Sequence, residues 1–143
     1  MIDIFHYFYI NASVTDVFKT ISTAEGLERW WSEKAVGNPL LGEHYKLSFG
    51  ATYNWTTVVS KLIPNKEFEL TITEANEDWI HTKVGFVLST RDNTTYVRFY
   101  HKNWKESNEH YRISCYCWAM YLRVLKRYLE FGEQVPYKDR LNV

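Results

Sequence analysis

Apolar and polar residues alternate with period two at the start of the chain and then change to helical spacing. Residues 3–10 (DIFHYFYI) place every second side chain on one side, which predicts a β-strand. In residues 13–22 the apolar positions recur every three to four residues. Ser13, followed three residues later by an acidic residue, resembles a capping box, so this segment predicts a helix. Residues 23–31 (TAEGLERWW) predict a second short helix with Thr23 as its cap.

The middle of the chain, from about residue 45 to residue 101, carries strand signals only. The expected strands span residues 44–50, 52–63, 67–75, 81–90 and 95–101. Turn residues such as Pro64 separate these strands, which predicts an antiparallel meander with one covered face. Glu69 and Arg98 fall in the polar register of their strands and are expected to face solvent. Two glycines and a proline within residues 37–42 predict a loop.

The last long segment, from about residue 106 to residue 131, has helical spacing and ends before Gly132, where a helix commonly stops. At about 100° per residue it presents two neighbouring stripes. The first is a core stripe of Tyr111, Cys115, Trp118, Leu122, Leu125 and Leu129. The second mixes polar and apolar residues: His110, Ser114, Cys117, Tyr121, Val124 and Tyr128. Such a mixture is typical of a helix that lines a cavity with apolar walls and a few polar groups.

The order of these elements predicts an α+β fold, because helices would pack on one face of an antiparallel sheet. We expect a curved antiparallel sheet wrapped around the long C-terminal helix, with two short helices after the first strand. The length of 143 residues favours a single domain over residues 1–143. A strongly curved sheet around one helix leaves space between them, so we expect an internal cavity.

Composition restricts the partners. Lysine plus arginine and aspartate plus glutamate both number 17, which argues against a large basic face for nucleic acid or an anionic membrane. No signal peptide or membrane-spanning segment is visible, and the two cysteines, Cys115 and Cys117, offer no disulfide framework, so a cytoplasmic protein is expected. Aromatic residues make up 17% of the chain, which suits a core, a ligand cavity or an interface. Trp79 and Tyr137 are candidates for a dimer interface.

The sequence contains no recognisable catalytic or metal motif. The five histidines lack ligand spacing, and the two cysteines lack the partners that a zinc site requires. We therefore expect no metal, no cofactor and no recognised catalytic set. His101, His110 and Tyr121 are the candidates for acid–base chemistry if the chain is an enzyme. Cys117 is expected to be an inert thiol, since burial raises a thiol pKa.

The chain resembles the homologues of the activator of heat-shock protein 90 ATPase, in the START-like (SRPBCC) superfamily. The likeness covers roughly residues 3–135. It is carried by the matching positions Val17, Phe18, Trp30, Trp31, Trp118, Leu122, Leu125, Leu129 and Gly132, and by His101 at the end of the last strand. The family commonly has glycine before the helix tryptophan, whereas this chain has Cys117, which would narrow a cavity there. The resemblance implies a single START-like domain with the helix-grip fold.

A binding module for a small apolar or amphipathic molecule is the function we expect, with the ligand unidentified. The candidate cavity residues are Trp30, Trp31, Tyr53, Trp55, Phe86, Phe99, His101, His110, Ser114, Cys117 and Tyr121. The resemblance implies that the tryptophan pair lies at the mouth of the grip, with one indole in the core and the other at the cavity entrance. It also implies two alternatives: a cyclase or hydrolase-like enzyme that uses the same cavity, and a chaperone-interacting domain, which the single domain disfavours. Both a monomer and a homodimer remain open.

Overall fold

The computed structural model describes residues 2–143. Its elements follow the expected order, and two are additional. One is a short strand after the second short helix, and the other is a 3₁₀ helix near the C-terminal end. They are β1 (Ile2–Ile10), α1 (Val14–Ser22), α2 (Ala24–Trp30), β2 (Lys34–Val36), β3 (His44–Phe49), β4 (Tyr53–Ile63), β5 (Glu67–Glu74), β6 (Lys83–Arg91), β7 (Thr94–Trp104), α3 (Glu109–Phe131) and the 3₁₀ helix η1 (Tyr137–Asn142).

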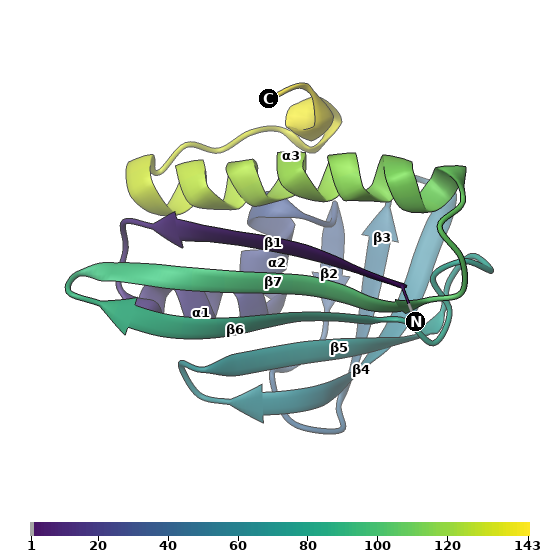
Figure 1. The fold of residues 1–143 in the computed structure, drawn as a ribbon, viewed down its shortest axis with the longest axis horizontal. Coiled ribbons are helices and arrows are strands. Elements are labelled where there is room, and N and C mark those ends of the chain that lie inside the picture. Colours follow the sequence, from purple (N-terminus) through teal and green to yellow (C-terminus); the bar gives the residue numbers. More distant parts are fainter. Residues whose placement is uncertain (1) are drawn as a thin grey trace.

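The strands form one antiparallel sheet in the order β1-β7-β6-β5-β4-β3-β2. The sheet curves, and α3 runs alongside the edge strand β1, with the C-terminal segment that contains η1 on the opposite side of α3, as Figure 1 shows. This arrangement confirms the predicted α+β helix-grip fold with two short helices after the first strand. Strand β2 was not singled out by the sequence pattern, because three residues are too few to show alternation.

Local sequence signals determine where the helices begin and end. The Ser13 side chain accepts a hydrogen bond from the backbone of the first turn of α1, and Thr23 does the same for α2, as predicted. Helix α3 begins later than expected, because the Asn108 side chain caps it by accepting from the backbone N–H of Tyr111 at 2.9 Å. Gly132 ends α3 in the left-handed conformation, with φ of 67°.

Three side chains of α3 bind the backbone of the edge strand β1 and of the residue that follows it. The Tyr111 hydroxyl donates to the carbonyl of Asp3 at 3.0 Å. The Lys126 ammonium donates to the carbonyl of Tyr9 at 2.6 Å. The Glu130 carboxylate accepts from the backbone N–H of Asn11 at 2.7 Å. The helix therefore satisfies part of the backbone that would otherwise be unpaired at this edge.

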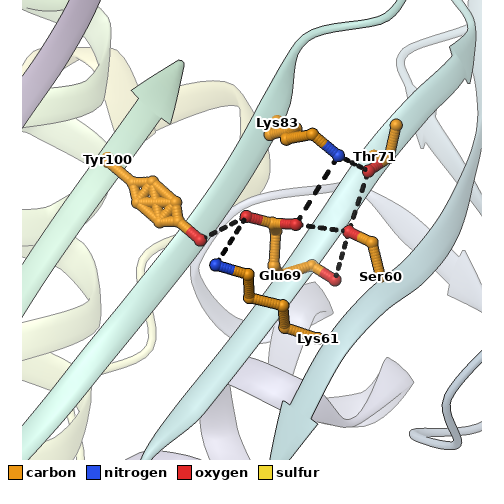
Figure 2. Close-up of polar contacts among 6 residues, drawn as sticks. All are labelled: Ser60, Lys61, Glu69, Thr71, Lys83 and Tyr100. Carbon is orange, nitrogen blue, oxygen red and sulfur yellow. Dashed lines mark hydrogen bonds and ion pairs between the residues drawn. The ribbon is translucent and has the colours of Figure 1, made fainter.

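The outer face of the sheet carries a buried carboxylate, which corrects the expectation that Glu69 faces solvent. Glu69 is only 3% exposed, whereas Arg98 is exposed as expected. Figure 2 shows the surrounding network: one carboxylate oxygen accepts from the Tyr100 hydroxyl at 2.5 Å and the other from the Ser60 hydroxyl at 2.6 Å. Lys83 lies 3.7 Å from the same carboxylate.

The Tyr100 ring covers Glu69 because the residue between them, Gly85, has no side chain. Glu69, Gly85 and Tyr100 occupy one row across β5, β6 and β7. A Cβ atom on Gly85 would come within 2.4 Å of the Tyr100 ring, so the absent side chain makes the space through which Tyr100 reaches Glu69. Alternation correctly assigned Glu69 to the outer face but could not reveal that Tyr100 lies over it.

Candidate functional site

A groove of about 620 Å³ opens between the N-terminal half of α3 and the strands β3 and β4. The chain between β5 and β6 and the start of η1 complete its walls. Its lining residues are Trp31, Phe49, Tyr53, Trp55, Asn76, Glu77, Asp78, Trp79, His110, Ile113, Ser114, Cys117, Trp118, Tyr121 and Tyr137. More than half of the surface of Tyr53 (57%) and of Ile113 (53%) is exposed, so the groove opens to solvent there.

The two adjacent tryptophans take different positions. Trp30 is completely buried in the core, and its indole N–H donates to the carbonyl of Thr20 at 3.3 Å. Trp31 lines the groove, where its ring centroid lies 5.2 Å from those of both Phe49 and Trp118. The two indoles stack on each other at 5.9 Å. The pair therefore joins the core to the groove wall.

A hydrogen-bonded chain behind the groove fixes two of its tryptophans. The Trp118 indole can only donate, so it gives its proton to Nδ1 of His101 at 3.0 Å. His101 therefore carries its own proton on Nε2 and donates to the Thr82 hydroxyl at 2.8 Å, which donates to the carbonyl of Trp79 at 2.5 Å. Burial lowers the pKa of His101 to about 3, with a smaller contribution from His110, so the imidazole is neutral.

At the N-terminal end of α3, a carboxylate and an imidazole form a pair. Asp78 accepts from Nδ1 of His110 at 2.8 Å and from the side-chain amide of Asn108 at 3.1 Å. The hydrogen bond from His110 is the main cause that lowers the pKa of Asp78, so this group is a carboxylate at neutral pH. The His110 ring is stacked on Trp79 with centroids 6.4 Å apart.

The mixed stripe of α3 provides the polar groups along the groove. Ser114 is 5% exposed and lies in the groove lining, between His110 and Tyr121 on α3. Burial raises the pKa of the Cys117 thiol, which supports the expected inert character. Burial also raises the pKa of Tyr121 to about 12, so its phenol keeps its proton at neutral pH.

Seven of the eleven residues proposed from the sequence line this groove together: Trp31, Tyr53, Trp55, His110, Ser114, Cys117 and Tyr121. The other four, Trp30, Phe86, Phe99 and His101, lie in the core instead. The physical reason is that tryptophan side chains fill the space between the sheet and the helices. Trp30 packs on Phe86 at 5.8 Å, Trp118 packs on Phe99 at 4.6 Å, and Trp79 covers His101 at 4.5 Å.

Sequence reasoning missed most of the acidic end of the groove. Asn76, Glu77, Asp78 and Trp79 lie in the connection from β5 to β6, where no periodic pattern assigns a face. Trp79, expected as an exposed interface residue, is instead buried against the groove. The only signal available was composition: a tryptophan directly after two acidic residues in a loop.

The described residues contain no cluster of three or more histidine, cysteine, aspartate or glutamate side chains that could hold a metal ion. Within residues 2–143, no helix has the length and apolar character needed to cross a membrane.

A family model and a solved relative assign this chain to the same family. Residues 11–130 match the model of the family described as Activator of Hsp90 ATPase homolog 1-like protein. The Aha1 dimer of Colwellia psychrerythraea, solved in solution, is 34% identical, with 93% of this chain and 99% of that chain covered and a TM-score of 0.83. No curated protein sequence matches the chain.

Two more distant structures share the fold alone. The protein MLL2253 of Mesorhizobium loti is 17% identical over 92% of this chain and 99% of that chain, with a TM-score of 0.83. CalU16 of Micromonospora echinospora is 16% identical over 98% of this chain and 84% of that chain, with a TM-score of 0.76.

Proposed function

This chain belongs to the Activator of Hsp90 ATPase homolog 1-like family, and from that premise we propose that it binds a small apolar or amphipathic molecule in the groove beside α3. The observation that carries the proposal is the combination of an aromatic-walled hollow of about 620 Å³ with a few polar groups of α3 in its lining, among them Ser114 and Tyr121. Hollows of this size hold drug-sized ligands, and one or two polar groups suffice to orient them.

The character of the walls favours a flat, unsaturated molecule. Trp55 lies between Phe49 and Trp79, with ring centroids 4.5 Å and 4.4 Å away. Trp31 and Trp118 add further ring surface. Aromatic rings offer large contact area and prefer offset or edge-to-face contact with other rings. The Ser114 hydroxyl would meet one polar atom of the ligand.

The test uses a neutral three-ring probe, 9-anthracenemethanol, and follows the anisotropy of its fluorescence. We expect saturable binding by the natural chain and loss of binding in Cys117→Trp, which fills the groove from α3. Tyr116→Trp is the matched control, since Tyr116 is an exposed neighbour on the same helix outside the groove lining. Equal binding by both variants, or no binding by the natural chain, would overturn the proposal.

A second candidate function is acid–base catalysis in the same groove, and the Asp78–His110 pair is the observation that favours it. A carboxylate that accepts from Nδ1 holds the imidazole in one tautomer and leaves Nε2 free to take a proton. His110→Gln would abolish any turnover of a bound substrate while leaving its binding intact. Unchanged turnover in this variant would exclude the pair as the base.

For the assembly we propose a homodimer, because the relative from Colwellia psychrerythraea is an Aha1 dimer in solution. Light scattering coupled to size-exclusion chromatography measures this directly. A mass of about twice 17.1 kDa is expected, and a mass of 17.1 kDa at all concentrations would contradict the proposal.

A further inference from the structure

The groove has two chemically different ends. Its wall on α3 runs from His110 to Tyr121, which spans about 16 Å along the helix axis. Glu77 and Asp78 line the end near His110, and Tyr137 lines the end near Tyr121. No lysine or arginine belongs to the lining within the described chain.

The end near His110 is negatively charged. Asp78 is a carboxylate because it accepts from His110 and Asn108. Glu77 is exposed and forms no ion pair with any side chain of residues 2–143. Even with His110 protonated, Glu77 leaves this end with one uncompensated negative charge. The charge of Lys105 helps to lower the pKa of Asp78, but Lys105 is not among the residues that line the groove.

The end near Tyr121 has no charged side chain in its lining. The guanidinium of Arg140 lies behind this wall, 5.7 Å from the centre of the Tyr137 ring. Arg140 is buried and donates to the backbone carbonyls of Glu28, Ser32 and Val135, which hold it in place. Glu28 and Glu33 offset the charge of Arg140, so the electrostatic attraction for a bound cation comes from the Glu77–Asp78 end.

The aromatic side chains of the lining also favour a cation at the Glu77–Asp78 end. The face of an aromatic ring carries partial negative charge and attracts a cation within about 6 Å, most strongly when the ring is that of tryptophan. Trp55 and Trp79 lie in contact at the acidic end, with ring centroids 4.4 Å apart, and Trp79 is stacked on His110. An anionic ligand, by contrast, would meet two carboxylates and no lysine or arginine in the lining.

We propose that the molecule bound in the groove is a flat, unsaturated cation, such as a protonated amine on a fused-ring system, whose positive charge lies at the Glu77–Asp78 end. This inference rests on the proposed ligand-binding function and adds the chemical class of the ligand. The hydroxyl of Ser114, one helical turn from His110 in the same lining, would contact a polar atom of the same molecule.

The experiment compares three probes of the same ring size and different charge: 9-aminoacridine as the cation, 9-anthracenemethanol as the neutral molecule and anthracene-9-carboxylate as the anion. Fluorescence anisotropy gives the dissociation constant of each at neutral pH and low salt. We expect the cation to bind about tenfold more tightly than the neutral probe, because a carboxylate and a ring face each contribute a few-fold. The anion is expected to bind more weakly than both.

Glu77→Gln removes the uncompensated charge without touching the Asp78–His110 pair. The preference for the cation should fall by about threefold in this variant and also fall on addition of salt. Glu74→Gln is the matched control: it removes an exposed carboxylate three residues away and outside the groove lining, and should change nothing.

The outcomes separate the two proposals. If none of the three probes binds, the proposed ligand-binding function fails and the inference fails with it. If all three bind alike, or the anion binds best, ligand binding stands and the cationic class is wrong. If the cation is preferred but Glu77→Gln and Glu74→Gln behave identically, the groove end is not the source of the preference and the inference is overturned.

Discussion

Acidification is expected to destabilise this protein mainly through one buried imidazole, that of His101. His101 is completely buried and accepts a hydrogen bond on Nδ1 from Trp118. A proton added to Nδ1 would face the indole N–H and would also place a charge in the core. Both effects oppose protonation in the folded state, whereas the unfolded chain takes up the proton freely.

The magnitude follows from the two pKa values. The pKa of His101 is 6.5 in the unfolded chain, and burial lowers it to about 3 in the folded protein. The stabilising effect of the neutral imidazole is thus complete above pH 6.5 and is lost as the pH falls from 6.5 towards 3. Each pH unit in this window costs about 1.4 kcal/mol, so at pH 5 the free energy of unfolding should be about 2 kcal/mol lower than at pH 7. In a chain of this length that corresponds to a melting temperature about 6–8 °C lower.

The assay is urea unfolding followed by tryptophan fluorescence at pH 7, 6 and 5. His101→Gln keeps an acceptor for Trp118 and a donor for Thr82 but cannot take up a proton in this range. Its free energy of unfolding should therefore lose about 2 kcal/mol less than that of the natural chain between pH 7 and pH 5. Burial also lowers the pKa of His6, so a smaller loss should remain in the variant. His44→Gln, at an exposed position, is the control.

The two carboxylates with a lowered pKa, Asp78 and Glu130, titrate largely below this window. The pKa of Asp78 lies below 3.8 and that of Glu130 below 4.5, so their stabilising effects are lost only at lower pH. If His101→Gln shows the same loss of stability between pH 7 and pH 5 as the natural chain, His101 is not the group that titrates, and the reasoning is refuted.

Three further perturbations test other parts of the structure by urea unfolding. Gly85→Ala should lower the free energy of unfolding by about 1–3 kcal/mol, because the new methyl group displaces the Tyr100 ring; a neutral result would contradict the close packing. Asn108→Ala should cost about 1 kcal/mol through loss of the α3 cap, and Asn108→Asp, which can still accept, should cost less. Trp118→Phe should cost about 1–3 kcal/mol beyond the lost ring area, since His101 loses its donor; a loss no larger than the lost ring area accounts for would show that the hydrogen bond contributes nothing.

The sequence predicted the fold well because periodicity and capping are local signals. The change from period two to helical spacing after the last strand identified α3, and Ser13 and Thr23 identified the starts of the two short helices. These signals depend on neighbours within a few residues, so a single sequence contains them. The mixed stripe of α3 was equally informative, and its members His110, Ser114, Cys117 and Tyr121 line the groove.

The remaining site residues could not be predicted because their positions depend on distant partners. Alternation assigned Phe86 and Phe99 to the inner face, but which part of that face stays open depends on where Trp30 and Trp118 pack. Adjacent tryptophans give no sign of which one points inward. The burial of Glu69 required knowledge of the strand register that brings Tyr100 to it across β6.

The contacts between α3 and β1 have a consequence for how this protein behaves at high concentration. An exposed strand edge can recruit a strand from another chain, which is how many sheets begin to aggregate. Here Tyr111, Lys126 and Glu130 occupy backbone groups of residues 3, 9 and 11, so an incoming strand would have to displace a helix. The opposite edge, β2, offers only three residues and begins with Lys34. The addition of strands from other copies is thus obstructed at both edges of the sheet. Copies of this chain would associate through side-chain surfaces instead.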